Sequence, residues 1–465
     1  MKLCLITILC LALVTMAQPS LAGDAPATTG TVLWISDIHF NPFYGRDVLK
    51  LATSDQKGWR DHTEWPAILA NMPANQSCSG KEDTNDFLLR MVVDHADTVT
   101  HASRPDFILI TGDFLSHDFT SFYFNQSGLP VSLAQVPQHN DFVSQTMAYI
   151  AMTISTKFDG IPVIAALGNN DAFCGDYDVR RDSGFLASTQ KTFQKYFLSD
   201  LSDDFRTVGG CYSTKIPGTQ HRVIVLNSIP FMKKYPDLQY VRSSSIMEDA
   251  CLSFSKIDLV DEFQWFRKIA DNLGDSEKVW IACHVPPGID CFQGTQYWDV
   301  ELADASRDSS FLEEFIGYYN SRGQHMAGIL AGHSHMAEFK LINNKNVPAS
   351  SVLMAPSISR IHANNASFRV MTFDRESLIV ADYVTHWLDA SMNPASPSWG
   401  APFKFTESYM QPDVSPRSLA AVYQQMTTSP VVLNRYFEDY STRNGSRNSS
   451  ARQNFKLAIP SVLGP

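Results

Sequence analysis

Hydrophobic positions in the middle of the chain follow two alternating patterns. Short runs of β-branched and other apolar residues predict strands, and longer stretches with apolar residues every three or four positions predict helices. The predicted strands are 31–37, 107–111, 162–167, 222–227, 279–283, 326–330, 351–354, 367–373 and 378–383. The predicted helices between them are 86–101, 141–156, 184–198, 259–273 and 311–319. Alternating strands and helices followed by strands alone predict a mixed sheet pair flanked by helices, an α/β fold.

The pattern changes near residue 400, where prolines interrupt the chain and two amphipathic stretches, 417–426 and 431–440, predict helices. We therefore expect a main domain over 30–399 and a small C-terminal helical lobe over 400–465, with a loosely held chain end. Residues 1–22 contain one lysine, an apolar core and small residues before Ala22, which is typical of a cleaved secretory signal. An uncleaved membrane anchor is the alternative, although the apolar core is short for a spanning helix.

Five of the predicted strands end in side chains of the kinds that bind metal ions. The residues at these ends are Asp37, His39, Asp113, Asn169, His284, His333 and His335. One strand-end aspartate often only caps a turn, but five such ends in one chain are hard to obtain by chance. Imidazoles and carboxylates hold the metals that activate water, and a shared carboxylate bridges a pair of them. The pattern predicts a dinuclear metal site with Asp113 as the bridge.

The blocks DIH, GDFLSHD, GNND, CH and GHSH occur in this order between Asp37 and His335. Jointly they resemble the signature of the calcineurin-like metallophosphoesterases. Within that superfamily the chain resembles the acid sphingomyelinase-like phosphodiesterases. The carriers of this narrower resemblance are DIHFNPFY at the first strand, His117 four residues after Asp113, and the C-terminal helical segment. The resemblance implies a four-layered α/β/β/α sandwich and two divalent metal ions, with zinc as the expected metal.

The resemblance also implies a role for each site residue. The first metal would be held by Asp37, His39, Asp113 and His335, and the second by Asp113, Asn169, His284 and His333. A metal-bridging hydroxide would attack phosphorus in line while both cations neutralise charge on the phosphoryl oxygens. His117 would then protonate the leaving group. We expect a secreted phosphodiesterase that acts on a small phosphate ester, such as a nucleotide or another phosphodiester.

The chain departs from the family pattern in three places. The block usually written GNH reads GNN, so Asn170 stands where a histidine would contact the phosphoryl group. Asn41 stands where relatives usually have aspartate. The expected mature chain begins close to the first strand, so we expect no saposin-like lipid-presenting domain, which weakens the prediction of sphingomyelin as substrate. Endopolyphosphatase or phosphomonoesterase activity stays open as an alternative, as does a non-catalytic binding role.

Charge and hydropathy exclude two kinds of partner. The formal net charge is −11, and an acidic surface argues against nucleic acid held by counterion release. After the signal, no apolar run approaches membrane-spanning length, so we expect no stable membrane insertion. The sequence does not indicate an oligomeric state. Among the remaining histidines, His362 and His386 follow or lie on late strands, and substrate contact is the alternative to plain packing there.

Cysteines and sequons fit an exported protein. After the signal, six cysteines remain, at positions 78, 174, 211, 251, 283 and 291. An even number in such a protein predicts disulfides, although the pairing is open. Cys283 lies inside an apolar strand, so we expect it to be a free, buried thiol. The sequons at Asn75, Asn125, Asn365, Asn444 and Asn448 predict glycosylation if the host glycosylates.

Overall fold

The structure is a computed structural model, and its described residues are 28–44, 57–70, 82–128, 132–179, 183–232, 256–301, 310–345, 347–389, 397–445 and 448–463. The predicted signal at 1–22, Asn75, Cys78 and Cys251 lie outside these ranges.

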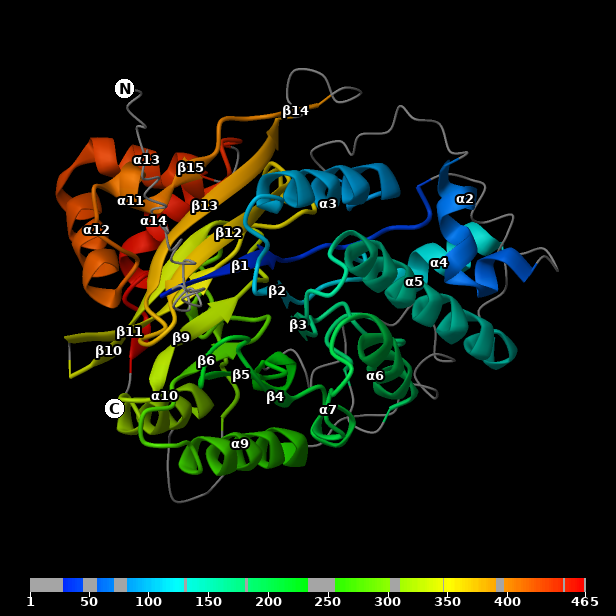
Figure 1. The fold of residues 1–465 in the computed structure, drawn as a ribbon, viewed down its shortest axis with the longest axis horizontal. Helices are drawn as coiled ribbons and strands as arrows, with labels where there is room; N and C mark the ends of the chain where they lie inside the picture. Colours follow the sequence, from blue (N-terminus) through cyan, green and yellow to red (C-terminus); the bar gives the residue numbers. More distant parts are fainter. Residues whose placement is uncertain are drawn as a thin grey trace, which may run out of the picture.

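Two seven-stranded sheets form the centre of the molecule (Figure 1). The first has the order β14-β13-β12-β1-β2-β3, with β15 pairing with β13. Its strands are β1 (Thr29–Ile35), β2 (Phe107–Thr111), β3 (Val163–Ala166), β12 (Ser367–Asp374), β13 (Val380–Asp389), β14 (Ser398–Trp399) and β15 (Phe403–Lys404). β1, β2 and β3 run parallel, with Val32 opposite Phe107 and Ile108 opposite Val163. Their carboxyl ends therefore lie at one edge of the sheet.

The second sheet has the order β16-β10-β11-β9-β6-β5-β4. Its strands are β4 (Tyr212–Lys215), β5 (Arg222–Val225), β6 (Val279–Ala282), β9 (Met326–Ala331), β10 (Glu338–Asn344), β11 (Val347–Met354) and β16 (Val462–Leu463). β5, β6 and β9 are parallel. A separate hairpin joins β7 (Gly288–Ile289) to β8 (Gln296–Tyr297).

Helices cover the outer faces of the two sheets, which gives the expected α/β/β/α order of layers (Figure 1). The longer helices of the main domain are α3 (Asp86–Thr100), α5 (Val136–Lys157), α6 (Gly184–Tyr196), α9 (Lys256–Asp271) and α10 (Phe311–Ser321). The shorter ones are α2 (Trp65–Ala70), α4 (Phe119–Ser127) and α7 (Asp204–Thr207). Beyond residue 400 come α11 (Phe405–Tyr409), α12 (Pro416–Thr428), α13 (Pro430–Tyr440) and α14 (Asn448–Ala458). Short 3-10 turns occupy Lys57–Arg60, His62–Glu64, Leu133–Gln135 and Ile229–Phe231.

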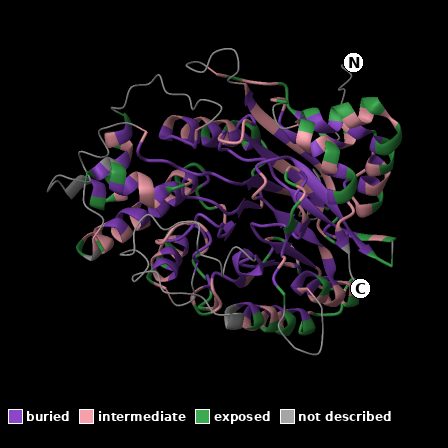
Figure 2. Ribbon diagram, turned by 180° about the vertical axis from the view of Figure 1, so that it is seen from behind, coloured by how far each residue is buried: buried purple, intermediate pink, exposed green. Residues whose placement is uncertain are grey.

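Buried side chains concentrate on the facing strands, and exposed ones lie on the outer helix faces (Figure 2). Every residue of β2 is buried, as expected for a central parallel strand. The two sheets meet through rings such as Trp280 of β6 and Phe373 of β12, whose centroids are 4.9 Å apart. α3 begins where the side chain of Asn85 accepts a hydrogen bond from Leu88 N, so an N-cap fixes its start.

Most predicted elements are present, but three expectations need correction. α5 begins at Val136 rather than at 141, because Pro137 fits the first turn of a helix. β10 was not predicted, because Glu338 and Lys340 break its apolar pattern; both are buried there and form an ion pair. The chain end is not loose up to Leu463, because α14 packs on α13 and β16 pairs with β10. The domain boundary at 400 stays a prediction.

The cysteines and one sequon also differ from expectation. Cys283 is free and buried as predicted, and Cys174 is disulfide-bonded. Cys211 and Cys291 are free and buried, so the predicted disulfides do not include them. Asn365 is 2% exposed, and its Nδ2 donates to Thr442 O at 2.9 Å. The folded chain therefore does not present this sequon for glycosylation.

Candidate metal centre

All seven predicted ligands lie together where the strand ends of the two sheets meet. Asp37 and His39 follow β1, Asp113 follows β2, Asn169 follows β3, His284 follows β6, and His333 and His335 follow β9. The loops are joined directly, since Asp37 N donates to Gly112 O at 3.1 Å and Gly332 N donates to His284 O at 3.0 Å. Six of the seven side chains are buried and His333 is half-buried. The sheet topology thus brings together His39 and His335, which are nearly 300 residues apart in the sequence.

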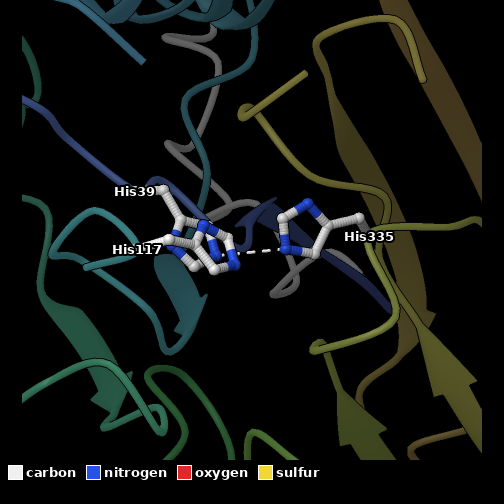
Figure 3. Close-up of side chains that lie close together, drawn as sticks. All are labelled: His39, His117 and His335. Carbon is white, nitrogen blue, oxygen red and sulfur yellow. Dashed lines mark hydrogen bonds between the residues drawn. The ribbon is translucent and has the colours of Figure 1, made fainter. Parts of the chain in front are cut away.

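The first cluster consists of Asp37, His39, Asp113 and His335. His39 Nε2 lies 3.2 Å from Asp113 Oδ2 and 3.1 Å from His335 Nε2. His335 Nε2 is in turn 3.6 Å from Asp37 Oδ1. Figure 3 shows His39 and His335 facing each other across this space, with the ring of His117 beside His39.

The second cluster consists of Asp113, Asn169, His284 and His333. His284 Nε2 lies 3.1 Å from Asp113 Oδ2 and 3.0 Å from Asn169 Oδ1. His333 reaches the same point through Nδ1, which is 3.2 Å from His284 Nε2. The same oxygen, Asp113 Oδ2, therefore faces a histidine of each cluster.

The donor set and its hydrogen bonds fit divalent cations. Asp37, His39 and Asp113, and likewise Asp113, His284 and His333, place one ligand atom each within 4.8 Å of one another. His39 Nδ1 lies 3.1 Å from the carbonyl of Leu115, and His284 Nδ1 lies 2.7 Å from the carbonyl of Thr111. A carbonyl only accepts, so the proton of each neutral ring sits on Nδ1 and the lone pair of Nε2 faces the cluster. This is how metal-binding histidines are held in proteins.

Electrostatics inside the cluster also favour a cation. Burial opposes protonation of His39 and His284, but the nearby Asp113 carboxylate outweighs it and raises the pKa of each imidazole to about 9. Burial likewise opposes ionisation of Asp113, yet His284 and His39 hold its pKa well below the ordinary value. The site thus attracts positive charge to these nitrogens. A ligand imidazole must be neutral, so a bound metal ion would replace the protons.

The backbone at the ligands has an unusual conformation that the sequence did not reveal. Five of the seven ligand residues have left-handed φ angles: Asp37 (48°), His39 (46°), Asp113 (56°), His333 (73°) and His335 (62°). Such a conformation costs about 1–3 kcal/mol for a residue other than glycine and concentrates at functional sites. Aspartate and histidine tolerate it better than most residues. The turns aim these side chains into the cluster rather than along the sheet faces.

Two glycines allow the strand ends to approach. A Cβ on Gly168 would lie 2.1 Å from Asp113 Oδ1, and a Cβ on Gly332 would lie 2.1 Å from Ser36 Oγ. Asp171 then ties the loops after β2 and β3 together, because its carboxylate accepts from the backbone N–H of Phe114 and Gly168 at 2.8 Å each. This agrees with a structural role for Asp171.

Several residues that support the ligands were not predicted from the sequence. Ser36 donates to Asp37 Oδ2 and accepts from Thr111 Oγ1 at 2.7 Å. Asn169 Nδ2 lies 2.5 Å from Asp176 Oδ1, which fixes the amide so that its oxygen faces His284. These residues carry no motif of their own. Only a tertiary structure shows which ligand each one supports.

His117 lies at the first cluster, as expected for a residue that acts there. Its ring stacks on His39 with centroids 4.0 Å apart, and it lies near His335 (Figure 3). Its Nδ1 faces the carboxylate of Asp83 at 3.1 Å. Burial opposes ionisation of Asp83, but hydrogen bonds from His117 and from Ser359 hold its pKa below the ordinary value. Asp83 was not singled out in the sequence, because it follows no predicted strand.

The two asparagines at the departures from the family pattern have clear contacts. Asn170 donates to Asp113 through both its backbone N (2.8 Å to Oδ1) and its Nδ2 (3.0 Å to Oδ2). Asn41 Oδ1 accepts from Phe43 N at 2.9 Å and so stabilises a turn. Asn170 therefore orients the carboxylate between the clusters.

His362 and His386, for which substrate contact and packing were the two alternatives, lie in different surroundings. The His362 ring lies 4.3 Å from that of His335 and 5.7 Å from that of His117, beside the first cluster. The His386 ring stacks on Phe368 with centroids 5.0 Å apart and lies near His95. His386 is therefore a packing residue.

Comparisons with known proteins agree with the fold. The family model for the calcineurin-like phosphoesterases matches residues 30–337, and the chain belongs to this family. It is a phosphoric ester hydrolase of the metallophosphoesterase superfamily, and it is similar to proteins named as phosphodiesterases. The family uses a dinuclear metal site, and the structure has candidate metal-binding residues for such a site.

The similar proteins with curated names include three phosphodiesterases. Acid sphingomyelinase-like phosphodiesterase 3b of Mus musculus is 26% identical over 445 residues, covering 89% of this chain and 83% of the relative. Sphingomyelinase phosphodiesterase D of Dictyostelium discoideum is 24% identical and covers 88% of each chain. Cyclic GMP-AMP phosphodiesterase SMPDL3A of Mus musculus is 26% identical, covering 62% of this chain and 61% of the relative.

Solved structures with lower similarity include a dimetal phosphatase from Danio rerio and PhoD. The former has a TM-score of 0.37 at 11% identity, covering 77% of this chain and 95% of that chain. PhoD has a TM-score of 0.40 at 11% identity, covering 84% of this chain and 71% of that chain.

In the part of the chain that the structure describes, no helix has the length and apolar character needed to cross a membrane.

Proposed function

We propose that the chain is a secreted phosphodiesterase with two divalent cations, held by Asp37, His39, Asp113 and His335 on one side and by Asp113, Asn169, His284 and His333 on the other. The observation that carries the proposal is the position of Asp113. Its Oδ2 lies 3.2 Å from His39 Nε2 and 3.1 Å from His284 Nε2, as a bridging carboxylate requires. Zinc suits this mixture of imidazole and carboxylate ligands.

The cations, when bound, supply an activated water for in-line attack on phosphorus and offset charge on the phosphoryl oxygens. The protein's own residues organise this centre. Asn170 and Asp171 fix the Asp113 carboxylate and the loops on either side of it. The hydrogen bond from Ser36 fixes Asp37, and Asp176 fixes the Asn169 amide. Because these contacts lie within the protein, little reorganisation is needed during reaction.

His117 is the proposed proton donor to the leaving group. It is partly open to solvent, with 28% of its side chain exposed, and its Nδ1 is held by Asp83. The proton on Nδ1 then points to Asp83, and Nε2 is the atom free to serve substrate. The buried carboxylate behind the imidazole fixes the orientation of the ring, as in other enzymes that use histidine as an acid.

The substrate class is proposed from the relatives and from the acidic surface. Relatives named as phosphodiesterases favour a phosphodiester, and one of them is named for cyclic GMP-AMP. We propose a small soluble diester or nucleotide. Endopolyphosphatase and phosphomonoesterase activities are the alternatives within the superfamily, and a non-catalytic binding role is a third. The apolar segment in residues 1–22 supports export to a secreted, lumenal or periplasmic location.

The test measures metal content and turnover on the same sample. Inductively coupled plasma mass spectrometry should find two divalent ions per chain, with zinc predominant. Bis(p-nitrophenyl) phosphate should be hydrolysed, and the activity should disappear with chelation and return with zinc. Two bound metals without hydrolysis of any diester, monoester or polyphosphate would favour the binding role. Preferential shortening of polyphosphate would favour the endopolyphosphatase.

A further inference from the structure

His362 lies on the loop between β11 and β12, beside the first cluster but outside the seven ligands. Its ring centroid is 4.3 Å from that of His335, with the planes at 66°, and 5.7 Å from that of His117, with the planes at 77°. It is half-buried, as is His117, whereas His39 and His335 are buried. The two half-buried imidazoles thus lie on the same side of the first cluster.

The loop that carries His362 is fastened to the metal centre. Ser359 N donates to Asp37 O at 3.1 Å, and Ser359 Oγ donates to Asp83 Oδ1 at 2.9 Å. Asn364 Nδ2 donates to Ser359 O at 3.0 Å. Anchors therefore lie on both sides of His362, three residues before it and two after it. These bonds fix the backbone of the loop close to His362 and so hold the loop against the first cluster.

The resemblance to the metallophosphoesterases implies a phosphoryl-contacting histidine at position 170, where this chain has no imidazole. Asn170 occupies it, and its backbone N–H and its amide Nδ2 each donate to Asp113. The chain therefore has no imidazole at this position for a phosphoryl group to meet. His362 supplies a donor of the same chemical kind from a different loop.

We propose that His362 donates a hydrogen bond to a phosphoryl oxygen of the substrate and so replaces the histidine absent at position 170. The proposal rests on the proposed function and specifies a substrate contact at the same site. His362 is not expected to bind metal. The groups of described residues whose ligand atoms lie within 4.8 Å of one another include His117 but not His362.

The experiment compares H362Q and H362A with wild type and with H101Q. His101 is exposed on the turn after α3, so H101Q controls for loss of a histidine far from the site. Three quantities are measured for each protein: metal ions per chain, kcat/KM for bis(p-nitrophenyl) phosphate, and the inorganic phosphate concentration that half-maximally raises the melting temperature of the metal-loaded protein. The last measurement needs no turnover.

We expect H362Q and H362A to keep two metals and the melting temperature of the phosphate-free protein. Both should lose about 10- to 100-fold in kcat/KM, and phosphate should bind correspondingly more weakly, as when a charge-assisted hydrogen bond is removed. H101Q should match wild type. Unchanged phosphate binding and turnover in the variants, or loss of a metal ion, would overturn the proposal while leaving the proposed function standing. A wild-type protein without two metals or without hydrolysis would overturn both.

Discussion

Asp83 changes what His117 can do, because it makes this imidazole one half of a polarised pair. The carboxylate is buried and accepts a hydrogen bond from the backbone N–H of His117 at 2.9 Å. Its other oxygen lies 3.1 Å from Nδ1 of the His117 ring. Ser359 Oγ donates to the same carboxylate at 2.9 Å. The pair is thus fixed by two loops that are distant in sequence. Its geometry supports proton donation by Nε2.

Replacement of His117 should affect substrates according to their leaving groups. We expect H117Q to slow esters of alkyl alcohols by about 10²–10⁴-fold, the usual contribution of general acid catalysis. Esters of nitrophenol should lose much less, because that group leaves without a proton, and metal content should stay unchanged. Parallel kinetics on both substrates measure this. Equal losses would mean that His117 positions the phosphate or supports a metal instead.

The sequence predicted the ligand types but not their support. Strand ends fix where Asp37, Asp113 and His284 stand, so their chemistry is readable from apolar runs alone. Asp83 precedes a helix rather than following a strand, and it reaches His117 only through the tertiary fold. Asp113 and His333 are residue types that tolerate left-handed φ angles, but most aspartates and histidines do not adopt them, so the sequence alone does not indicate these angles.

Among the elements, α5 carries a buried histidine that couples stability to pH. His139 is fully buried against the rings of Tyr123 and Phe124, and burial lowers its pKa to about 4 despite the hydrogen bond that its Nδ1 donates to Asn140 Oδ1. In the unfolded chain a histidine titrates near 6.5. The neutral ring therefore favours the folded state above pH 6.5, and this contribution is lost as pH falls from 6.5 towards 4.

We expect the free energy of unfolding to fall by about 2 kcal/mol between pH 7 and pH 5 through His139 alone. The variant H139F, which keeps an aromatic ring but cannot be protonated, should lose that much less over the same range. Urea titrations at the two pH values measure the difference, with H101Q as an exposed control. An identical pH dependence in H139F and wild type would show that His139 does not titrate in this way.

The C-terminal helices are joined to the site loops after α13. Thr442 Oγ1 accepts from Asn365 N at 3.0 Å and donates to Asn365 O at 2.8 Å, and both residues are buried. Asn365 lies on the loop that carries His362. The segment after α13 is therefore joined to the loop that carries His362.

Removal of the Thr442 hydroxyl should cost stability. We expect T442V to lower the free energy of unfolding by about 1–3 kcal/mol, because a buried N–H loses its acceptor, whereas T442S should stay close to wild type. Urea unfolding of the three proteins gives the comparison. If T442V were as stable as T442S, the Thr442 hydroxyl would not contribute to stability.

Taken as a whole, the molecule presents an acidic surface with scattered apolar side chains. The large exposed ones among the described residues are Val99, Val260, Val347, Ile379, Met410, Val431 and Leu457. They lie on separate helices, strands and connecting segments, and none is next to a metal ligand in the sequence. An enzyme that works on a bilayer needs apolar or basic surface near its site.

We therefore expect soluble diesters to be turned over faster than sphingomyelin in vesicles. Cyclic dinucleotides, nucleoside phosphodiesters and vesicle-bound sphingomyelin are to be compared at equal phosphorus concentration, with the sphingomyelin also supplied in detergent. Higher turnover on unassisted vesicles than on any soluble diester would contradict this expectation.

At the same scale, the layered fold was predictable because alternating strands and helices leave few arrangements. The pairing of β16 with β10 was not, since two residues at the chain end carry too little pattern to identify a strand. Likewise, the even number of cysteines predicted disulfides, yet Cys211 is buried and free. Both outcomes depend on which segments meet in space.

The central claim is that one carboxylate, Asp113, joins two cations into a single centre. Removal of a bridge leaves two positive ions that repel each other, so D113A should fold, lose at least one metal and lose turnover of bis(p-nitrophenyl) phosphate. Metal ions per chain, counted by mass spectrometry on the variant and on wild type after the same zinc loading, decide the matter. We predict two for wild type and at most one for D113A; two metals with near-normal turnover in D113A would contradict the account.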